Sequence, residues 1–461
     1  MDSPRRPIMF VTLPESGLMN SLRVLAGELA RRGVQDIWFA TDEHRRGDVE
    51  ALADKSKVEF WSLGEVEPRL SALTWSDEVY RAVTQPSRFK SHKAMIKHSY
   101  DPGVHLPKYE RLSAAVDEVE PALMVIDTTA AFGVDVAVTK NIPYVLSAPY
   151  LPSNLVSTYM PFGKSYTSPD FPVPHSGLPL RMTPLQRLQN RLFRWRTLGI
   201  FLDPRMARMM IEDSRKRKEL GIDWKARKPM GAVELAEMVL CYSVAEMDYP
   251  FTPPRNMRLV GAVVPPLPEA PDDVEMSRWL SEQDSVVYMA FGTNTRLTKP
   301  QVDDLLEVAR RLEGRHQFLW KLPTGQQHLL PTDGSMPGNV RVEDWIPSQY
   351  DALAHPNVKA MFTHAGGNSF HESLYFGKPL VSRPLWIDCH DQALRGQDFG
   401  VSLTLDRPAG FDPDDVVDKL TRVLTESSFR ERAEHYRDLL RGAGGRERAA
   451  DLLVGLVSGR E

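Results

Sequence analysis

The sequence predicts an α/β protein composed of two doubly wound domains, and three observations lead to this fold class. A chain of 461 residues is longer than one hydrophobic core usually supports. In both halves, short apolar runs alternate with amphipathic stretches, which is the pattern of strand–helix–strand units around a parallel sheet. Between the halves, residues 249–271 are rich in proline and are typical of an interdomain linker.

The first half supplies the elements of an N-terminal domain, which is expected at residues 1–248. A buried strand is predicted at residues 8–13, a helix that ends at Gly33 follows it, and a second strand comes at residues 36–40. Because a strand, a helix and a strand in this order form a parallel pair, helices should cover both faces of the sheet. Further apolar strands are expected at residues 122–127, 143–148 and 238–242.

An insertion of loops and short helices is expected within this domain at residues 151–230. Prolines and aromatic residues are frequent there, and they interrupt the helical pattern. Insertions that lie on top of a domain often carry a substrate pocket, so we expect one substrate to bind on this side.

The second half repeats the same order and predicts a C-terminal domain at residues 272–440. A final helix, residues 441–461, is expected to pack back on the N-terminal domain. Doubly wound sheets bind ligands at the carboxyl ends of their strands, so the binding cleft should lie between the domains. The strands are predicted at residues 285–291, 317–321, 358–362 and 379–382, and one helix at residues 301–312.

Composition excludes several function classes. The net charge is −4, so no basic excess points to nucleic acid. The two cysteines, Cys241 and Cys389, have no pairing or zinc-binding spacing, which disfavours a disulfide framework or a structural metal and fits a reducing cytoplasm. The sequence shows neither a signal peptide nor an apolar stretch long enough to span a bilayer, so a cytoplasmic location is expected.

A phosphate-binding turn is the strongest chemical signal in the sequence. The strand at residues 358–362 delivers His364 to its carboxyl end, followed by Gly366 and Gly367 and then by a helix that should start at Asn368 or Ser369. Glycines let backbone amides approach an anion closely, and a helix start adds unpaired N–H groups. On its own, the same pattern also fits an ordinary capped helix.

The motifs around this turn favour phosphate binding over an ordinary capped helix, because together they resemble a known signature. Residues 344–349 (Asp-Trp-Ile-Pro-Ser-Gln), 362–369 (Phe-Thr-His-Ala-Gly-Gly-Asn-Ser), Glu372, 377–379 (Gly-Lys-Pro) and 384–388 (Pro-Leu-Trp-Ile-Asp) occur in this order. Together they resemble the donor-binding signature of the family 1, UDP-glycosyltransferase-like enzymes. That resemblance implies the GT-B fold, in which two Rossmann-like domains face a central cleft.

The resemblance implies a role for each matching residue on the nucleoside side. Trp345 would stack on the nucleobase, and the backbone of Ile346 would contact the edge of the base. Gln349 and Glu372 would bind the ribose, with Glu372 accepting from its hydroxyls. A flat aromatic face suits a base, and a carboxylate suits two neighbouring hydroxyls.

The same resemblance assigns the diphosphate and the sugar. His364 would hold the diphosphate with help from Asn368, Ser369 and Thr293, the last of which lies in the turn after the strand at residues 285–291. Asp388 would bind hydroxyls of the sugar. The family implies no cofactor and no metal, because the nucleotide sugar is itself the donor substrate.

Two departures from the family pattern occur, and the first concerns the sugar. Family members usually have Gln after the aspartate that binds the sugar, whereas this chain has Cys389 and His390. Cys389 is small and weakly polar, so the pocket should suit a deoxygenated or amino sugar better than glucose.

The second departure concerns the general base. Inverting members usually carry Gly-His after the first strand, but here Leu18 follows Gly17, and leucine cannot accept a proton. Either another group is the base, or the chain binds nucleotide sugars without catalysis. Asp127, at the end of a strand, is the leading candidate base, although it could instead be a helix N-cap or a loop carboxylate. His92 and His98 are the alternative candidates.

A closer resemblance narrows the substrates. Residues 13–18, 38–43, 78–85 and 395–406 look like those of the polyene macrolide mycosaminyltransferases, which also lack the usual Gly-His. This implies transfer of mycosamine from GDP-mycosamine to a polyene macrolactone of the amphotericin, nystatin or pimaricin type. Inversion without a covalent intermediate or a metal would follow.

Two alternatives to this function remain open at this point. The donor could be a UDP-sugar used on a sterol or polyketide, or the chain could be a non-catalytic activator that binds a nucleotide sugar. Residues 192–202, which are apolar and basic together, could line an acceptor cleft, pack as a core helix or contact a membrane surface.

Overall fold

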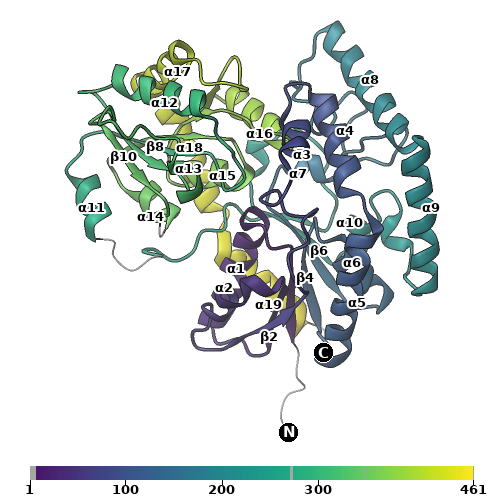
Figure 1. Ribbon diagram of the computed structural model, residues 1–461. Coiled ribbons are helices and arrows are strands. Elements are labelled where there is room, and N and C mark those ends of the chain that lie inside the picture. Colours follow the sequence, from purple (N-terminus) through teal and green to yellow (C-terminus); the bar gives the residue numbers. More distant parts are fainter. Residues whose placement is uncertain (1–6, 270–273, 347, 460–461) are drawn as a thin grey trace.

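The computed structural model describes residues 7–269, 274–346 and 348–459 and contains two α/β domains side by side (Figure 1). Each domain is built on a parallel sheet with helices on both faces, which confirms the predicted fold class. Every strand predicted from the sequence is present to within two residues at each end. Residues 270 and 271 of the expected linker and Pro347 of the donor motif lie outside the described residues.

The N-terminal sheet has seven strands in the order β3-β2-β1-β4-β5-β6-β7, and all neighbouring strands are parallel. Its central strands are buried along their whole length, as expected for a sheet covered on both faces. The strands are β1 (Ile8–Val11), β2 (Ile37–Thr41), β3 (Val58–Ser62), β4 (Leu123–Asp127), β5 (Tyr144–Ala148), β6 (Met238–Cys241) and β7 (Met257–Leu259).

The first set of helices around this sheet precedes the 151–230 insertion. They are α1 (Ser16–Arg31), η1 (Glu43–Arg45), α2 (Arg46–Glu50), α3 (Asp77–Thr84), α4 (Arg88–Ser99), α5 (Pro102–Val119) and α6 (Ala131–Thr139).

The insertion itself holds two long helices. The first of these begins with a complete capping box, in which Thr183 and Gln186 exchange hydrogen bonds between side chain and backbone. These two long helices are α8 (Pro184–Phe201) and α9 (Pro204–Glu219). The other helices between β5 and β7 are α7 (Pro152–Leu155), η2 (Lys225–Arg227), α10 (Gly231–Leu235) and η3 (Ala245–Met247).

Part of the segment expected to be a linker belongs to the N-terminal sheet instead. β7 lies inside residues 249–271 and pairs in parallel with β6. It is only three residues long and alternates buried Met257 with exposed Arg258, so it lacks the apolar run that marked the other strands.

The C-terminal sheet has six parallel strands in the order β10-β9-β8-β11-β12-β13. Its strands are β8 (Val286–Ala290), β9 (Gln317–Lys321), β10 (Val340–Glu343), β11 (Val358–Thr363), β12 (Leu380–Ser382) and β13 (Ser402–Thr404). Its helices are α11 (Val274–Ser281), α12 (Lys299–Arg311), α13 (Thr324–Gln327), α14 (Gln349–Ala354), α15 (Gly367–Tyr375), α16 (Ile387–Asp398), α17 (Pro413–Thr425) and α18 (Ser427–Gly442).

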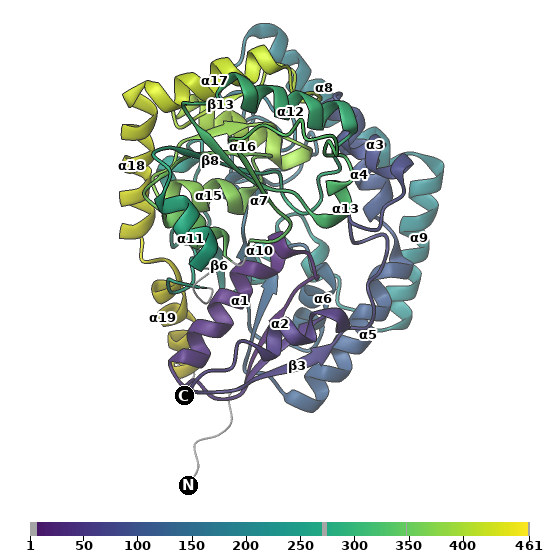
Figure 2. The same cartoon turned by 60° about the vertical axis from the view of Figure 1, so that its left-hand side comes forward.

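The last helix, α19 (Gly445–Ser458), leaves the C-terminal domain and lies along α1 of the N-terminal domain (Figure 2). Its Ala449, Ala450 and Leu453 are fully buried in the same core as Leu22 and Leu25. The chain therefore crosses between the domains twice, and the second crossing is anchored by apolar burial.

No helix among residues 7–269, 274–346 and 348–459 combines the length and the apolar character that a membrane span requires.

Candidate functional site

The diphosphate turn lies where β11 ends at the cleft between the domains. Ala365 has a positive φ of 60°, which turns the chain sharply, and Gly366 is the N-cap of α15. The helix thus starts at Gly367, and the expectation that it starts at Asn368 or Ser369 is wrong. The helix start leaves the N–H groups of the first turn without helical partners, one residue after the Gly366 that contacts the His364 ring.

His364 is held between two glycines, and this arrangement depends on their lack of side chains. A Cβ added to Gly292 would lie 2.7 Å from Cε1 of His364, and one added to Gly366 would lie 2.5 Å from its Nε2. Burial and, to a lesser extent, the nearby Arg383 together lower the pKa of His364 to about 4. The ring is therefore neutral near pH 7, so it can donate a hydrogen bond but brings no charge.

Arg383 supplies the positive charge that His364 lacks, and sequence reasoning missed it. Thr363 and Ser382 are partners in the register of β11 and β12, so His364 and Arg383 follow side by side at the strand ends. Arg383 is buried, its guanidinium lies 5.0 Å from the ring centroid of Phe411, and its Nε and Nη1 have no hydrogen-bond partner among the described residues. Burial lowers the pKa of this guanidinium. A buried, unpaired cation beside a neutral histidine can bind an anion.

The predicted nucleoside side of the cleft presents an exposed aromatic face. Trp345 is 63% exposed, and Nζ of Lys321 lies 4.4 Å from its ring centroid. The side chain of Ile346 is buried, which anchors this part of the loop in the core of the C-terminal domain. An exposed tryptophan anchored by a cation is suited to stacking against a flat ring.

Gln349 and Glu372 are brought together at the predicted ribose position. Nε2 of Gln349 donates a hydrogen bond to Oε2 of Glu372, and its Oε1 accepts from the hydroxyl of Tyr288 at 3.1 Å. Burial raises the pKa of Glu372 to about 7, although Gln349 and Tyr350 oppose the shift by hydrogen bonding to the carboxylate. The pair forms an oriented acceptor for hydroxyl groups.

Both domains reach the start of α15. Nδ2 of Asn368 donates to the backbone oxygen of Gly17 at 2.9 Å, so the turn that carries Leu18 touches the diphosphate turn directly. A Cβ on Gly367 would lie 2.6 Å from the oxygen of Pro149. A small pocket opens here, and it is lined by Ser21, Pro149, Tyr242, Ala262, Val263, Asn368, His371 and Glu372.

Thr293 is exposed in the turn after β8, and Ser369 is half-buried in the first turn of α15. The loop that carries Thr293 is held against the N-terminal domain by Arg296. Its Nη1 pairs with Asp77 at 2.9 Å, its Nη2 donates to the oxygen of Trp75 at 2.6 Å, and its backbone N–H donates to the hydroxyl of Tyr80 at 2.9 Å.

Asp388 lies half-buried in the first turn of α16, close to the cleft. Burial and, to a lesser extent, the neighbouring Asp391 together raise its pKa to about 6. Cys389 is buried, and burial raises the pKa of its thiol well above the usual range. His390 turns toward the N-terminal domain, where its Nε2 contacts Nη1 of Arg88.

Asp127 ends β4 at the same edge of the N-terminal sheet, and it is completely buried. Its Oδ2 accepts from the hydroxyl of Thr129 at 2.6 Å and from Thr12 at 3.2 Å, and its Oδ1 accepts from the N–H of Thr129 at 3.1 Å. Burial raises the pKa of Asp127. Because Thr129 is exposed, its hydroxyl links the buried carboxyl to the surface.

Neither of the two candidate histidines shares a described contact with Asp127. His92 stacks on Tyr159, and its Nδ1 is 3.2 Å from Nδ1 of His175; burial lowers its pKa to about 3. His98 packs edge-on against Trp75, which in turn contacts Trp386 across the cleft. Both are held within packed clusters, which favours a structural role for each.

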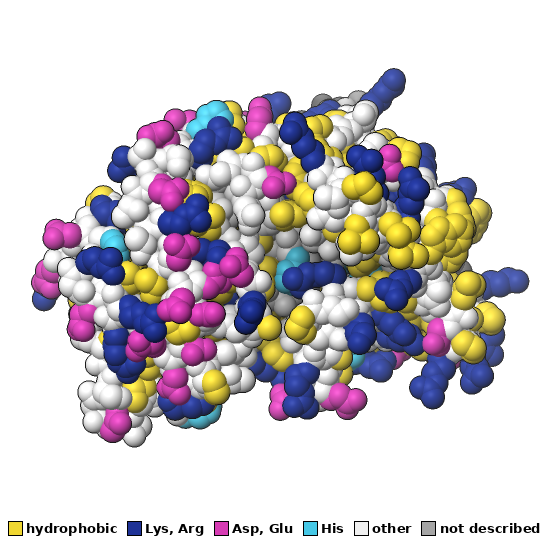
Figure 3. Space-filling model, turned by 90° about the horizontal axis from the view of Figure 1, so that it is seen from above, with side chains coloured by type: hydrophobic (Ala, Val, Ile, Leu, Met, Phe, Trp, Pro, Cys, Tyr) yellow, Lys and Arg dark blue, Asp and Glu magenta, His cyan; other side chains and the backbone are white. Residues whose placement is uncertain are grey.

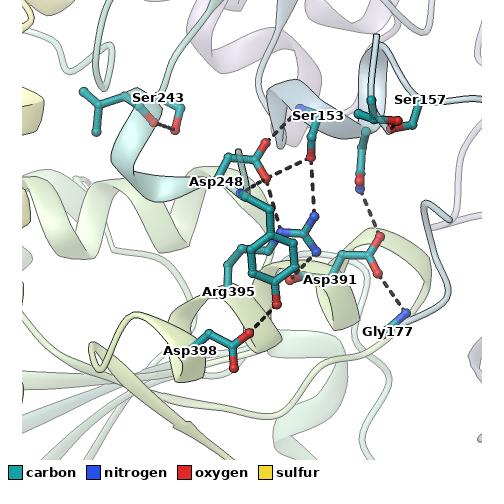
Figure 4. Close-up of polar contacts among 12 residues, drawn as sticks. Ser153, Ser157, Gly177, Ser243, Asp248, Asp391, Arg395 and Asp398 are labelled. Atoms are coloured by element: carbon teal, nitrogen blue, oxygen red, sulfur yellow. Dashed lines mark hydrogen bonds and ion pairs between the residues drawn. The ribbon is translucent and has the colours of Figure 1, made fainter. Parts of the chain in front are cut away.

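A buried polar network joins the domains beside the predicted sugar position (Figure 4). Nε of Arg395 on α16 pairs with Asp248 at 3.3 Å, and Asp248 also accepts from the N–H and the hydroxyl of Ser153, both at 2.8 Å. Asp391 accepts from the N–H groups of His175 and Gly177 at 2.6 and 2.9 Å. These bonds fix α16, and with it Asp388, against the N-terminal domain.

Comparisons with known proteins agree with this architecture. The glycosyltransferase of kitacinnamycin has a TM-score of 0.67 at 19% identity and covers 98% of this chain and 100% of its own. The calicheamicin glycosyltransferase CalG4 has a TM-score of 0.66 at 18% identity, with 99% of both chains covered. At these identities the likeness shows the fold, which is GT-B.

Sequence relatives extend over most of the chain. The UDP-glucuronosyltransferase 2C1 of Oryctolagus cuniculus is 27% identical over 343 residues, which is 73% of this chain and 63% of the relative. The 2-hydroxyacylsphingosine 1-beta-galactosyltransferase of Mus musculus is 29% identical over 202 residues, which is 42% of this chain and 35% of the relative. The matched region spans about three fifths of the length of the first of these relatives.

The family description "UDP-glucoronosyl and UDP-glucosyl transferase" matches residues 65–439. This region contains the turn at His364, the buried cation Arg383, the ribose-side pair Gln349 and Glu372, and Trp345. The chain therefore belongs to the UDP-glucuronosyl and UDP-glucosyl transferase family.

Proposed function

We propose that the chain is an inverting glycosyltransferase that transfers mycosamine from GDP-mycosamine to a hydroxyl of a polyene macrolactone. The observation that carries the proposal of sugar transfer is the placement of His364 between Gly292 and Gly366, beside the unpaired Arg383. The macrolactone and the amino sugar are supported by the resemblance described above and by the departure at Cys389 and His390.

The proposed mechanism relies mainly on stabilisation of the leaving diphosphate. The diphosphate accepts hydrogen bonds from His364 and from the first turn of α15, while Arg383 compensates the charge that grows as the bond between sugar and phosphate breaks. The cleft aligns the acceptor hydroxyl with the anomeric carbon, and attack from the opposite face inverts its configuration. The nucleoside diphosphate leaves as the product.

Asp127 is the proposed base, and its burial defines how it would act. No part of its side chain is exposed, so a large acceptor does not contact it directly in this arrangement. We propose that the hydroxyl of Thr129 passes the proton, since it is exposed and lies 2.6 Å from Oδ2 of Asp127. The raised pKa of Asp127 makes its carboxylate a better proton acceptor than a solvated one.

The identity of the nucleotide is the first test of the proposal. The relatives are named for UDP-sugars, which favours a UDP-sugar-dependent enzyme as the second candidate function. Under the GDP-mycosamine proposal, GDP should raise the unfolding temperature of the chain more than UDP does at equal concentration, because a ligand that binds only the native state stabilises it. Differential scanning fluorimetry with GDP, UDP and no nucleotide measures this.

A larger shift with UDP would refute the GDP assignment and leave the reaction class in place. The same comparison on Trp345→Ala is the control, since removal of the stacking face should reduce the shift for both nucleotides. If the nucleotides raised the unfolding temperature of Trp345→Ala as much as that of the wild type, the nucleobase would not stack on Trp345.

The affinity for the nucleoside diphosphate should depend on the charge of Glu372. Because burial raises its folded pKa to about 7, Glu372 stabilises the free protein below its unfolded pKa, and this stabilisation is lost as the pH rises through 7. Binding has the opposite sign, since ribose hydroxyls donate to the carboxylate. We expect affinity to rise about tenfold between pH 6 and pH 8 in calorimetric titrations.

The control for this pH dependence is Glu372→Gln, which keeps the shape of the side chain and removes its titration. At pH 8 this variant should bind the nucleoside diphosphate more weakly than the wild type does. Its affinity should change with pH only as far as the phosphate itself titrates. Equal pH profiles for the two proteins would show that Glu372 does not bind the ribose as a carboxylate.

A further inference from the structure

Helix α8 carries a row of large apolar side chains that point to solvent. Leu185, Leu188, Leu192, Trp195 and Leu202 at its end are between 47% and 70% exposed, and we call them the α8 stripe. Single exposed apolar residues are ordinary, but a row of five on one helix face is not.

The stripe lies opposite the face by which α8 packs on the domain. The buried residues of the helix are Asn190, Phe193, Thr197 and Ile200, and Phe193 packs on Phe89 and His92 of α4. At 100° per residue, the stripe is centred roughly 150° around the helix axis from this buried face. It is therefore a second apolar face and not a part of the core.

Phe162, which is 74% exposed, extends this surface away from the helix. Its ring packs edge-on against Trp195, with centroids 5.7 Å apart. The stripe thus continues onto a neighbouring loop and forms a patch two elements wide.

The charge beside the stripe is strongly positive. Helix α8 contains four arginines and no acidic residue, with Arg187, Arg191 and Arg194 on one flank and Arg196 on the other. Residues 181–219 hold eleven Lys and Arg against four Asp and Glu, although the whole chain has a net charge of −4. Figure 3 shows hydrophobic and basic side chains gathered side by side at the right of the view from above, the side on which α8 lies.

These observations select one occupant for the surface. A second copy of the chain would bring two strongly positive faces together, and charge repulsion opposes that contact. An anionic lipid surface matches both features, because acyl chains accept the apolar stripe while arginine side chains extend to the phosphates.

We propose that α8 docks the protein on membranes that contain anionic lipids, with its axis parallel to the membrane plane. The apolar stripe enters the interface, and Arg187 and Arg191 contact lipid phosphates. The guanidinium of Arg194 is held instead by the backbone oxygens of Pro169 and Phe171. The helix lies on the surface and does not span the bilayer. This proposal does not depend on which sugar or acceptor the cleft binds.

Vesicle co-sedimentation tests the docking with the full chain. We expect the protein to pellet with phosphatidylcholine vesicles that contain about a third of phosphatidylglycerol, and to bind pure phosphatidylcholine roughly tenfold more weakly or less. The variant Leu188→Glu/Trp195→Glu should lose this binding at least about tenfold. Both positions are exposed, so its unfolding temperature should match that of the wild type.

A matched charge control separates docking from general attraction. Arg187→Glu/Arg191→Glu should weaken binding to the anionic vesicles by roughly tenfold or more, because each arginine near the surface contributes. Arg315→Glu/Arg430→Glu makes the same change of net charge at exposed positions of the C-terminal domain and should change binding by less than about twofold.

Equal losses in the two charge variants would overturn the proposal, as would wild-type affinity in Leu188→Glu/Trp195→Glu. Light scattering of the lipid-free protein tests whether a second copy of the chain binds the stripe instead. A dimer that the Leu188→Glu/Trp195→Glu variant abolishes would assign the stripe to a second copy of the chain instead.

Discussion

Replacing His364 with alanine should lower the rate of sugar transfer by about two to three orders of magnitude, which is the usual effect of removing one donor to a developing anion. The ring is the neutral donor at the strand end, and two glycines leave the space for it. Alanine would remove this hydrogen-bond donor and leave the charge of Arg383 in place, so the diphosphate would still bind but would be poorly oriented. The rate of donor consumption by the purified variant measures the effect.

The control for this prediction is His328→Ala, which removes an exposed histidine from the same domain. It should leave both the rate and the unfolding temperature unchanged. If His364→Ala kept its rate to within about tenfold while His328→Ala behaved as expected, His364 would not hold the leaving group.

Replacing Arg395 with methionine should destabilise the folded chain by about 3–5 kcal/mol, because it leaves Asp248 as an uncompensated buried charge. Both side chains are about 1% exposed, and the guanidinium also lies 4.0 Å from the ring centroid of Tyr249. Methionine keeps much of the packing volume, so the loss reports the charge. Urea unfolding followed by tryptophan fluorescence gives the change in free energy of unfolding.

A double variant tests the cause of this loss. Asp248→Asn in the Arg395→Met background removes the stranded charge and should recover part of the stability. Arg315→Met, at an exposed position, should cost less than about 0.5 kcal/mol. A loss of less than about 1 kcal/mol in Arg395→Met would mean that the pair contributes no more than a surface ion pair.

The sequence was sufficient to predict most of the fold, because the signal for it is local. Alternation of apolar strands with amphipathic helices locates β1, β2, β4 and β8 without any knowledge of contacts. β3 was missed because four of its five residues are only partly buried, so it lacks a continuous apolar run. β7 was missed because it is short and lies among prolines.

The candidate site was predictable where a motif is contiguous and not where contacts cross between elements. The turn from His364 to Ser369, the pair Gln349 and Glu372, and Trp345 come from one ordered signature. Arg383 was not predicted as a site residue, because its place beside His364 depends on the register between β11 and β12, which the sequence does not show. An arginine directly after an apolar strand was the available signal.

The interdomain contacts were also beyond sequence reasoning. Arg395 and Asp248 are 147 residues apart, and no sequence pattern pairs them. The contact from Asn368 to Gly17 joins residues 351 positions apart. Such pairs arise only when two domains close on each other, and local patterns carry no record of that geometry.

The measurement that tests the central claim most directly is turnover by the purified chain. Incubation with GDP-mycosamine and a polyene macrolactone should give a product whose mass exceeds that of the macrolactone by one mycosaminyl residue, with release of GDP. Asp127→Asn should bind the donor normally and form product at least about a hundredfold more slowly. Donor binding by the wild type without turnover of any nucleotide sugar and acceptor would contradict the account and identify a non-catalytic nucleotide-sugar-binding protein.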